Sequence, residues 1–239
     1  MASREEEKRL RREEREKAEA AAASSQARGK RLQFLIGALV TIAVVVGVVL
    51  AVSGGGGDDM GSTGSPSDPP ENVDATIPPV KERNLEKAVA AAKCKVSSPT
   101  IEGSTHVDEK VEYQTSPPTS GNHNAQAALD GIYEAGNEPE PENYVHALEH
   151  GRVVVQYKAG STPELVSQLE AVVSEELNAK AGYKTLLLQN NTKMEAAVVA
   201  TAWGQMLTCD TPSDAMFDAL RAFRVQYVDK GPENIPPTN

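Results

Sequence analysis

The strongest constraint on this chain is a run of 21 uncharged and mostly apolar residues, at positions 32–52. The run contains no charged residue, and the first one after it is Asp58. As a helix it would be about 30 Å long, which matches the hydrocarbon core of a bilayer. A cleaved signal peptide has a shorter apolar region and a small-residue cleavage site. The run therefore predicts a retained transmembrane signal-anchor helix, which we place at residues 32–53.

The charges that flank this helix predict its orientation. Residues 1–31 carry 10 Lys+Arg against 7 Asp+Glu, whereas the rest of the chain carries 14 against 27. Since the positively charged flank of a membrane helix stays in the cytoplasm, we expect a plasma-membrane protein with residues 1–31 as a cytoplasmic charged tail. The remainder is then extracytoplasmic. Its acidic balance argues against nucleic acid as a partner, because phosphate binding needs a basic surface.

The part after the helix divides into a linker and one domain. Residues 54–80 are rich in Gly, Ser and Pro and predict a linker, residues 81–230 a domain, and residues 231–239 a C-terminal tail. We expect helices at 82–94, 162–179 and 211–228, and strands at 111–114, 152–157, 183–189 and 195–207. The last two strands flank a turn at 190–193 and should pair as a hairpin. This order predicts an α+β domain with helices packed on a mostly antiparallel sheet.

The chain has two cysteines, Cys94 and Cys209, and both lie in the predicted extracytoplasmic part. Two cysteines in an oxidising compartment usually form a disulfide. A shared metal is the weaker interpretation, because the two are far apart and neither belongs to a CxxC motif. Met206 lies near Cys209 and is expected to belong to the core.

Histidines are concentrated in one segment. All four lie in the first half of the outer domain, at His106, His123, His146 and His150. Positions i and i+4 share one face of a helix, so His146 and His150 could bind the same metal ion. His123 ends a Gly- and Pro-rich loop that could fold over and supply a third ligand. Glu149 would be a fourth ligand or would orient an imidazole and raise its basicity.

The predicted ligands are therefore His123, His146, His150 and Glu149, with copper or zinc as the ion. A thioether from Met206 would favour copper over zinc. Two alternatives stay open. The histidines could brace the fold of a cell-envelope interaction or scaffold module, by satisfying backbone carbonyls and pairing with Glu149. The chain could also be a metal-dependent hydrolase, because residues 146–150 match the His-x-x-Glu-His motif of one class of zinc protease. The short helix expected there argues against an enzyme but leaves the question open.

Three blocks of sequence resemble a known family. They are PPTSGxH at residues 117–123, VHxLEHG at residues 145–151 and TAWG at residues 201–204. Together they resemble the bacterial domain of unknown function 3105 family, over about residues 82–229. The resemblance implies an N-terminal anchor followed by one extracytoplasmic domain, and it implies no established activity. It marks His123, His146, Glu149 and His150 as motif positions.

Overall fold

The computed structural model describes residues 65–67, 75–233 and 235–237, which belong to a compact unit spanning residues 60–239. The predicted cytoplasmic tail, the predicted transmembrane helix and most of the predicted linker lie outside the described residues. No helix within these ranges is long and apolar enough to span a bilayer. The transmembrane helix at residues 32–53 therefore stays a prediction.

A six-stranded sheet, in the order β1-β8-β7-β3-β6-β2, forms the centre of the domain. Its strands are β1 (Lys95–Ser97), β2 (Gly131–Ile132), β3 (Val153–Tyr157), β6 (Thr185–Gln189), β7 (Val198–Ala202) and β8 (Gln205–Cys209). The pairs β1–β8, β8–β7 and β7–β3 are antiparallel, whereas β3–β6 and β6–β2 are parallel. A separate two-stranded ribbon joins β4 (Glu176–Leu177) to β5 (Lys180–Ala181). The sheet is mostly antiparallel, as predicted.

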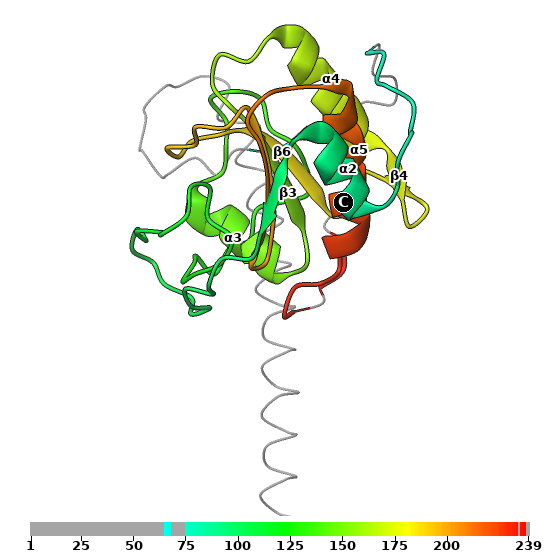
Figure 1. Ribbon diagram of the computed structural model, residues 1–239. Helices are drawn as coiled ribbons and strands as arrows, with labels where there is room; N and C mark the ends of the chain where they lie inside the picture. The colour runs from blue at the N-terminus through cyan, green and yellow to red at the C-terminus, as the bar shows by residue number, and fades with distance from the viewer. Residues whose placement is uncertain (1–64, 68–74, 234, 238–239) are drawn as a thin grey trace, which may run out of the picture. The chain divides into compact units, whose positions relative to one another are not determined.

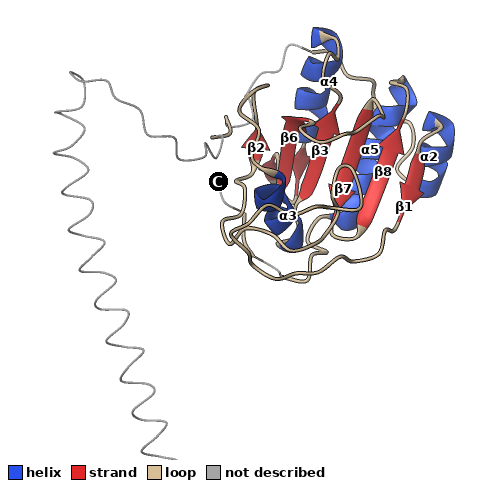
Figure 2. Cartoon of the chain, turned by 90° about the vertical axis from the view of Figure 1, so that its left-hand side faces the viewer, coloured by secondary structure: helices blue, strands red, loops and turns tan. Residues whose placement is uncertain are grey.

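Four described helices cover the two faces of this sheet. They are α2 (Leu85–Ala92), α3 (Pro141–Glu149), α4 (Pro163–Ser174) and α5 (Asp214–Tyr227). Figure 2 shows α3 in front of the sheet and α5 behind it, next to α2. The two sides of β3 explain this arrangement, since alternate residues of a strand point to opposite faces. Val153 and Val155 pack into the core formed with α2, α4 and α5, whereas Val154 packs with α3.

The helix boundaries follow local capping signals. The side chain of Thr162 accepts a hydrogen bond from the backbone N–H of Leu165, and Pro163 occupies the first turn of α4. The prediction of this helix is confirmed, but it ends at Ser174 instead of residue 179. Glu175 is extended, and the β4–β5 ribbon begins immediately after it. The predicted helices at 82–94 and 211–228 correspond to α2 and α5.

The predicted hairpin between residues 183–189 and 195–207 is wrong. In the structure β6 pairs with β3 and β2, and β3 separates it from β7. The predicted strand at 195–207 is two strands, because Trp203 and Gly204 form a tight turn between β7 and β8. Gly204 has a φ of 65°, which a glycine adopts without strain. Residues 111–114 form no strand.

The disulfide between Cys94 and Cys209 is confirmed and joins the chain just after α2 to the end of β8. It closes a loop of 115 positions, for which chain entropy predicts a stabilisation of roughly 4–5 kcal/mol. Met206 on β8 packs against the small buried cluster of Met194, Ala196 and Val199.

Candidate metal centre

The candidate site lies along α3, the helix on the face of the sheet opposite α5. Pro141 occupies its first turn, and every residue from Glu142 to Glu149 is buried. Among them Asn143, His146 and Glu149 recur every third position and form a polar stripe. Buried polar side chains need partners, so the structure that covers this stripe must supply them. The long loop before α3 does so.

A bridge within this loop places two of the histidines side by side. His106 and His123 face each other in an isolated parallel β-bridge. The backbone N–H of His123 donates to Thr105 O at 3.0 Å, and Val107 N–H donates to His123 O at 2.8 Å. The two imidazole centroids are 5.1 Å apart. Residues 17 positions apart in sequence are thereby held together by main-chain bonds.

The PPTSGxH block shapes the loop around His123. Gly121 has a φ of 130°, and a Cβ added there would lie 2.7 Å from the ring of Tyr113. The hydroxyl of that tyrosine donates to Asn122 O, and burial raises the pKa of the hydroxyl. The Thr119 carbonyl accepts from the N–H of Gly204, which ties this block to the TAWG turn. The glycine is needed both for its conformation and for the close approach of the aromatic ring.

Backbone carbonyls orient the two buried imidazoles. Nδ1 of His123 lies 2.8 Å from Gly121 O, and Nδ1 of His146 lies 2.8 Å from Asn124 O. A carbonyl only accepts hydrogen bonds, so both Nδ1 atoms carry a proton. In the neutral ring Nε2 then presents a lone pair. This arrangement prepares an imidazole for metal binding.

One group of four ligands converges at this point. Single ligand atoms from His106, His123, His146 and Glu149 all lie within 4.8 Å of one another. The last three residues are buried and His106 is exposed. Bonds of about 2.0–2.1 Å to a tetrahedral ion would put the ligand atoms roughly 3.4 Å apart. Modest side-chain adjustments would therefore let all four residues bind one ion. We call these four residues the first group.

The contact between His123 and Glu149 is unusual. Nε2 of His123 lies 3.0 Å from Oε2 of Glu149, with the two side chains 0% and 7% exposed. That distance is short enough for an ion pair, yet no described residue gives Nε2 a hydrogen bond. If Nδ1 carries the only proton of the ring, two lone pairs face each other in a buried space. A metal cation, or a proton on either the imidazole or the carboxyl group, is required.

A second group forms at the end of α3 from His146, His150 and Glu233. The rings of His146 and His150 have centroids 4.3 Å apart, as their helical spacing predicts. Nε2 of His150 lies 3.3 Å from Oε2 of Glu233. Of the predicted ligands, the structure thus gathers His123, His146 and Glu149 and places His150 in this neighbouring group.

Both histidines on α3 favour the neutral form. Burial and, to a smaller extent, the charge of the nearby His150 lower the pKa of His146 to about 4. Burial also lowers the pKa of His150, and the charge of Arg152 acts in the same direction. A neutral imidazole is the form that binds a metal, so at pH 7 neither ring must lose a proton first.

A family model described as "Protein of unknown function (DUF3105)" matches residues 105–238. That stretch is more than half of the chain and contains every residue of both groups. The chain belongs to the DUF3105 family. No curated protein and no solved structure matches the chain. The family expected from the three sequence blocks is therefore confirmed, and α2 and β1 lie before the matched DUF3105 region.

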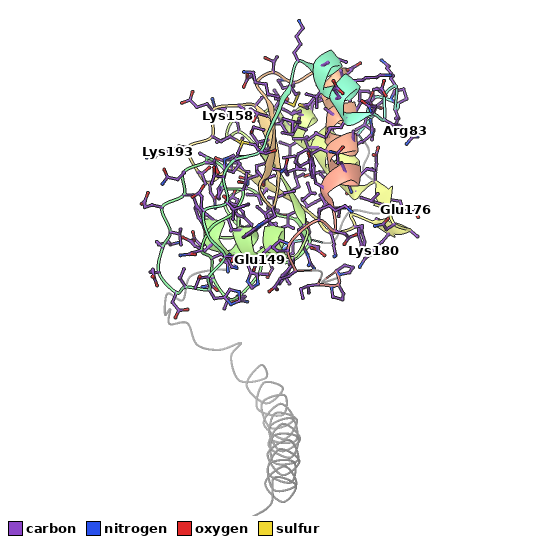
Figure 3. The ribbon with its side chains drawn as sticks, turned by 60° about the horizontal axis from the view of Figure 1, so that its bottom comes forward. Arg83, Glu149, Lys158, Glu176, Lys180 and Lys193 are labelled. Atoms are coloured by element: carbon purple, nitrogen blue, oxygen red, sulfur yellow. A yellow bond between two sulfur atoms is a disulfide. The ribbon has the colours of Figure 1, made fainter. Side chains whose placement is uncertain are left out.

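His106 and Glu233 were not among the residues predicted for the site. The only signal for His106 was that all four histidines share one half of the outer domain. Nothing in the sequence pointed to Glu233, which lies 83 positions after His150 and comes close only in the folded chain. Figure 3 labels Glu149, the ligand of the first group that lies at the end of α3.

Proposed function

We propose that this DUF3105 protein binds one divalent transition-metal ion through His106, His123, His146 and Glu149. The observation that carries the proposal is the buried Nε2 of His123, which faces the Glu149 carboxylate without a hydrogen bond. A cation between these atoms turns an unfavourable contact into two metal–ligand bonds. Buried polar atoms without partners are rare, and a bound ion is one of the ordinary explanations.

The chemistry of the ligands supports a zinc or copper ion. Imidazole suits both metals, and a carboxylate completes a set of three nitrogens and one oxygen. Glu149 supplies one negative charge in a buried place, which offsets part of the charge of the ion. The thioether of Met206 packs against Met194 and Val199, so the ligand set contains no soft sulfur that would select copper.

The exposed His106 suggests how the ion is reached. Three ligands are buried on or against α3, whereas His106 lies at the surface. An ion in this position would be open to solvent on the His106 side. Such a site suits the capture or transfer of a metal better than a sealed structural site does, because one ligand can be displaced without unfolding the loop.

We further propose that the domain is extracytoplasmic and anchored by a helix at residues 32–53. The uncharged run of 21 residues and its basic N-terminal flank support this topology. The disulfide supports it too, because disulfides persist mainly outside the cytoplasm. A reporter fused after residue 80 should be active only outside the cytoplasm. Reporter activity in the cytoplasm would overturn the proposed topology but would not bear on the proposed metal site.

Metal binding is tested on the full-length protein in mild detergent. Elemental analysis after equilibration with Zn²⁺ or Cu²⁺ should find a single tightly bound ion per chain. Glu149→Gln should weaken binding by roughly tenfold or more. Glu176→Gln is the matched control, because Glu176 is an exposed glutamate on β4 that lies away from Glu149 (Figure 3). Equal binding by wild type and Glu149→Gln, or no ion in wild type, would overturn the proposal.

Thermal unfolding provides a second measurement on the same samples. An ion that binds only the folded chain stabilises it by roughly 4 kcal/mol at a thousandfold excess over Kd. The melting temperature of wild type and of Glu176→Gln should therefore fall when a chelator is added. The melt of Glu149→Gln should respond much less.

A further inference from the structure

His146 belongs to both groups of ligands, and it can serve only one of them at a time. Its Nδ1 is held by Asn124 O at 2.8 Å, which leaves Nε2 as the atom available to an ion. Nε2 has one lone pair and forms one bond to a metal. The first group and the second group therefore share a single ligand atom.

We infer that His146, His150 and Glu233 form a second metal position, filled in alternation with the first, and that an ion passes between the two while bound to Nε2 of His146. The inference rests on the proposed function, because the first group is the other end of this path. No residue changes its oxidation state. The ion exchanges His150 and Glu233 for His106, His123 and Glu149, while its bond to His146 persists.

The short path supports this exchange. Because Nε2 of His146 has a single lone pair, the imidazole must turn as the ion moves, and the two positions, each about 2.0–2.1 Å from Nε2, are at most about 4 Å apart. Each group also contains one carboxylate, Glu149 in the first and Glu233 in the second. The move therefore requires no change in the number of negative ligands around the ion.

The second group is held in place by the backbone on both sides. His150 caps α3, with its N–H directed to His146 O at 3.2 Å. The N–H of Glu233 donates to Glu149 O at 3.0 Å. A Cβ added to Gly231 would lie only 2.1 Å from that same carbonyl oxygen, which shows how closely the C-terminal segment lies on the end of α3. Glu233 is thus positioned next to His150 by main-chain contacts.

Arg152, which follows the end of α3, binds the same C-terminal segment. Its guanidinium donates to Ile235 O at 3.1 Å and to Pro236 O at 2.6 Å, just beyond Glu233. The arginine is itself buried and pairs with the buried carboxylate of Asp130 at 2.9 Å. Glu233 therefore lies between two fixed points, the bond to Glu149 O before it and the arginine contacts after it.

The two positions differ in exposure, which gives the path a direction. His150 is 14% exposed and Glu233 52% exposed, whereas His123 is 0% and Glu149 7% exposed. The second group offers three ligands and leaves room for water, so it should bind more weakly and exchange faster. His106 is exposed as well, but it is one of four ligands in the first group, so an ion should exchange faster at the second group and be retained longer at the first.

The test uses Cu²⁺ and the full-length protein in mild detergent, read by electron paramagnetic resonance. Glu149→Gln should leave one weaker site whose spectrum reports fewer nitrogen ligands than wild type. His106→Ala, which removes an exposed ligand, is the second variant that disables the first group. Adding His150→Ala and Glu233→Gln to either variant should abolish the remaining binding. Wild type should not hold two ions in these groups at once.

The rate of exchange is the second readout. In otherwise wild-type protein, His150→Ala with Glu233→Gln should slow the transfer of Cu²⁺ to a competing chelator several-fold. The same pair should lower the equilibrium affinity less than Glu149→Gln does. The inference is overturned if the residual copper binding of Glu149→Gln is unaffected by His150→Ala and Glu233→Gln. It is also overturned if wild type binds two ions in the two groups at once, or if the rate of copper transfer to the chelator is unchanged. Absence of any ion in wild type would instead overturn the proposed function.

Discussion

Nε2 of His123 and Oε2 of Glu149 lie 3.0 Å apart in a buried space, and each is an acceptor as long as the imidazole is neutral. The Gly121 carbonyl accepts a hydrogen bond from the N–H at Nδ1 of His123, so the ring cannot turn this N–H toward the carboxylate without losing that bond. This pair separates the two main interpretations of the site. A metal between the atoms makes it a binding site, whereas an extra proton makes it a buried ion pair that braces the fold.

Glu149→Gln distinguishes these interpretations in the metal-free protein. The glutamine amide can donate a hydrogen bond to the lone pair on Nε2 of His123, so the free energy of unfolding should stay equal or rise. If His123 were a buried imidazolium, the variant would remove its counter-charge and cost roughly 3–5 kcal/mol. Urea unfolding with a chelator present at pH 7.5 measures the difference. Glu176→Gln, which changes an exposed glutamate, should leave the free energy nearly unchanged.

Trp203 should report the binding of copper by fluorescence. It is the only tryptophan in the chain, and its ring centroid lies 6.1 Å from that of His123. Cu²⁺ quenches an excited indole at this distance, whereas Zn²⁺ has no partly filled d shell to do so. We expect quenching that saturates at one Cu²⁺ per chain in wild type and that needs a higher Cu²⁺ concentration in Glu149→Gln. Equal titration curves for the two proteins would contradict the first group as the binding site.

The pH dependence of stability should report His146. Its pKa is lowered to about 4 in the folded chain from an unfolded value near 6.5, mainly because it is buried. Between these values the unfolded chain binds more protons, so the free energy of unfolding falls as pH falls from about 6.5 to 4. At 1.36 kcal/mol per pH unit the loss from this residue is roughly 3 kcal/mol at most.

Unfolding of the metal-free protein between pH 7.5 and 4 measures this slope. His146→Asn is the matched control, because its amide does not titrate and can replace Nδ1 as the donor to Asn124 O. We expect the variant to lose less stability over the same range. If the free energy of unfolding of wild type and His146→Asn depends on pH with the same slope, the loss of stability comes from the titration of other groups.

Local patterns in the sequence predicted the elements well and their pairing less well. The apolar run of β3 and the Thr162 cap of α4 are local signals, and both elements formed near the expected positions, although α4 ends at Ser174. The turn at residues 190–193 was also a local signal, but it did not produce a hairpin. Burial on both faces favours a central position for β6, between β3 and β2, and that choice depends on the whole sheet. The strands β1 and β2 have three and two residues, too few for a periodic pattern.

The same limit applies to the site. Helical spacing put His146, Glu149 and His150 at one end of one helix, and the structure agrees. His106 comes to the site through a backbone bridge to His123, and Glu233 through a hydrogen bond to Glu149 O. Each of these contacts joins segments that are distant in sequence, and neither has a local signature. Side chains brought in by such main-chain contacts are the part of a site that a sequence alone does not show.

Arg152→Met should reveal how far the C-terminal segment depends on one buried charge. The guanidinium is buried against Asp130, and it also donates to His150 O, Ile235 O and Pro236 O. Removing one partner of a buried ion pair typically costs roughly 3–5 kcal/mol. Arg152→Met with Asp130→Asn should recover part of this loss, since the carboxylate is then neutral as well. Urea unfolding measures both variants.

The same variant also bears on Glu233. Without the bonds to the carbonyls of Ile235 and Pro236, Glu233 keeps the hydrogen bond of its N–H to Glu149 O and the contact of its carboxylate with His150. Arg152→Met should therefore weaken copper binding in a Glu149→Gln background, where the second group is the remaining site. Arg152→Lys retains the charge but offers a single nitrogen for several acceptors, so it should fall between wild type and Arg152→Met. Unchanged copper binding in both variants would show that Glu233 is held by its own backbone bond alone.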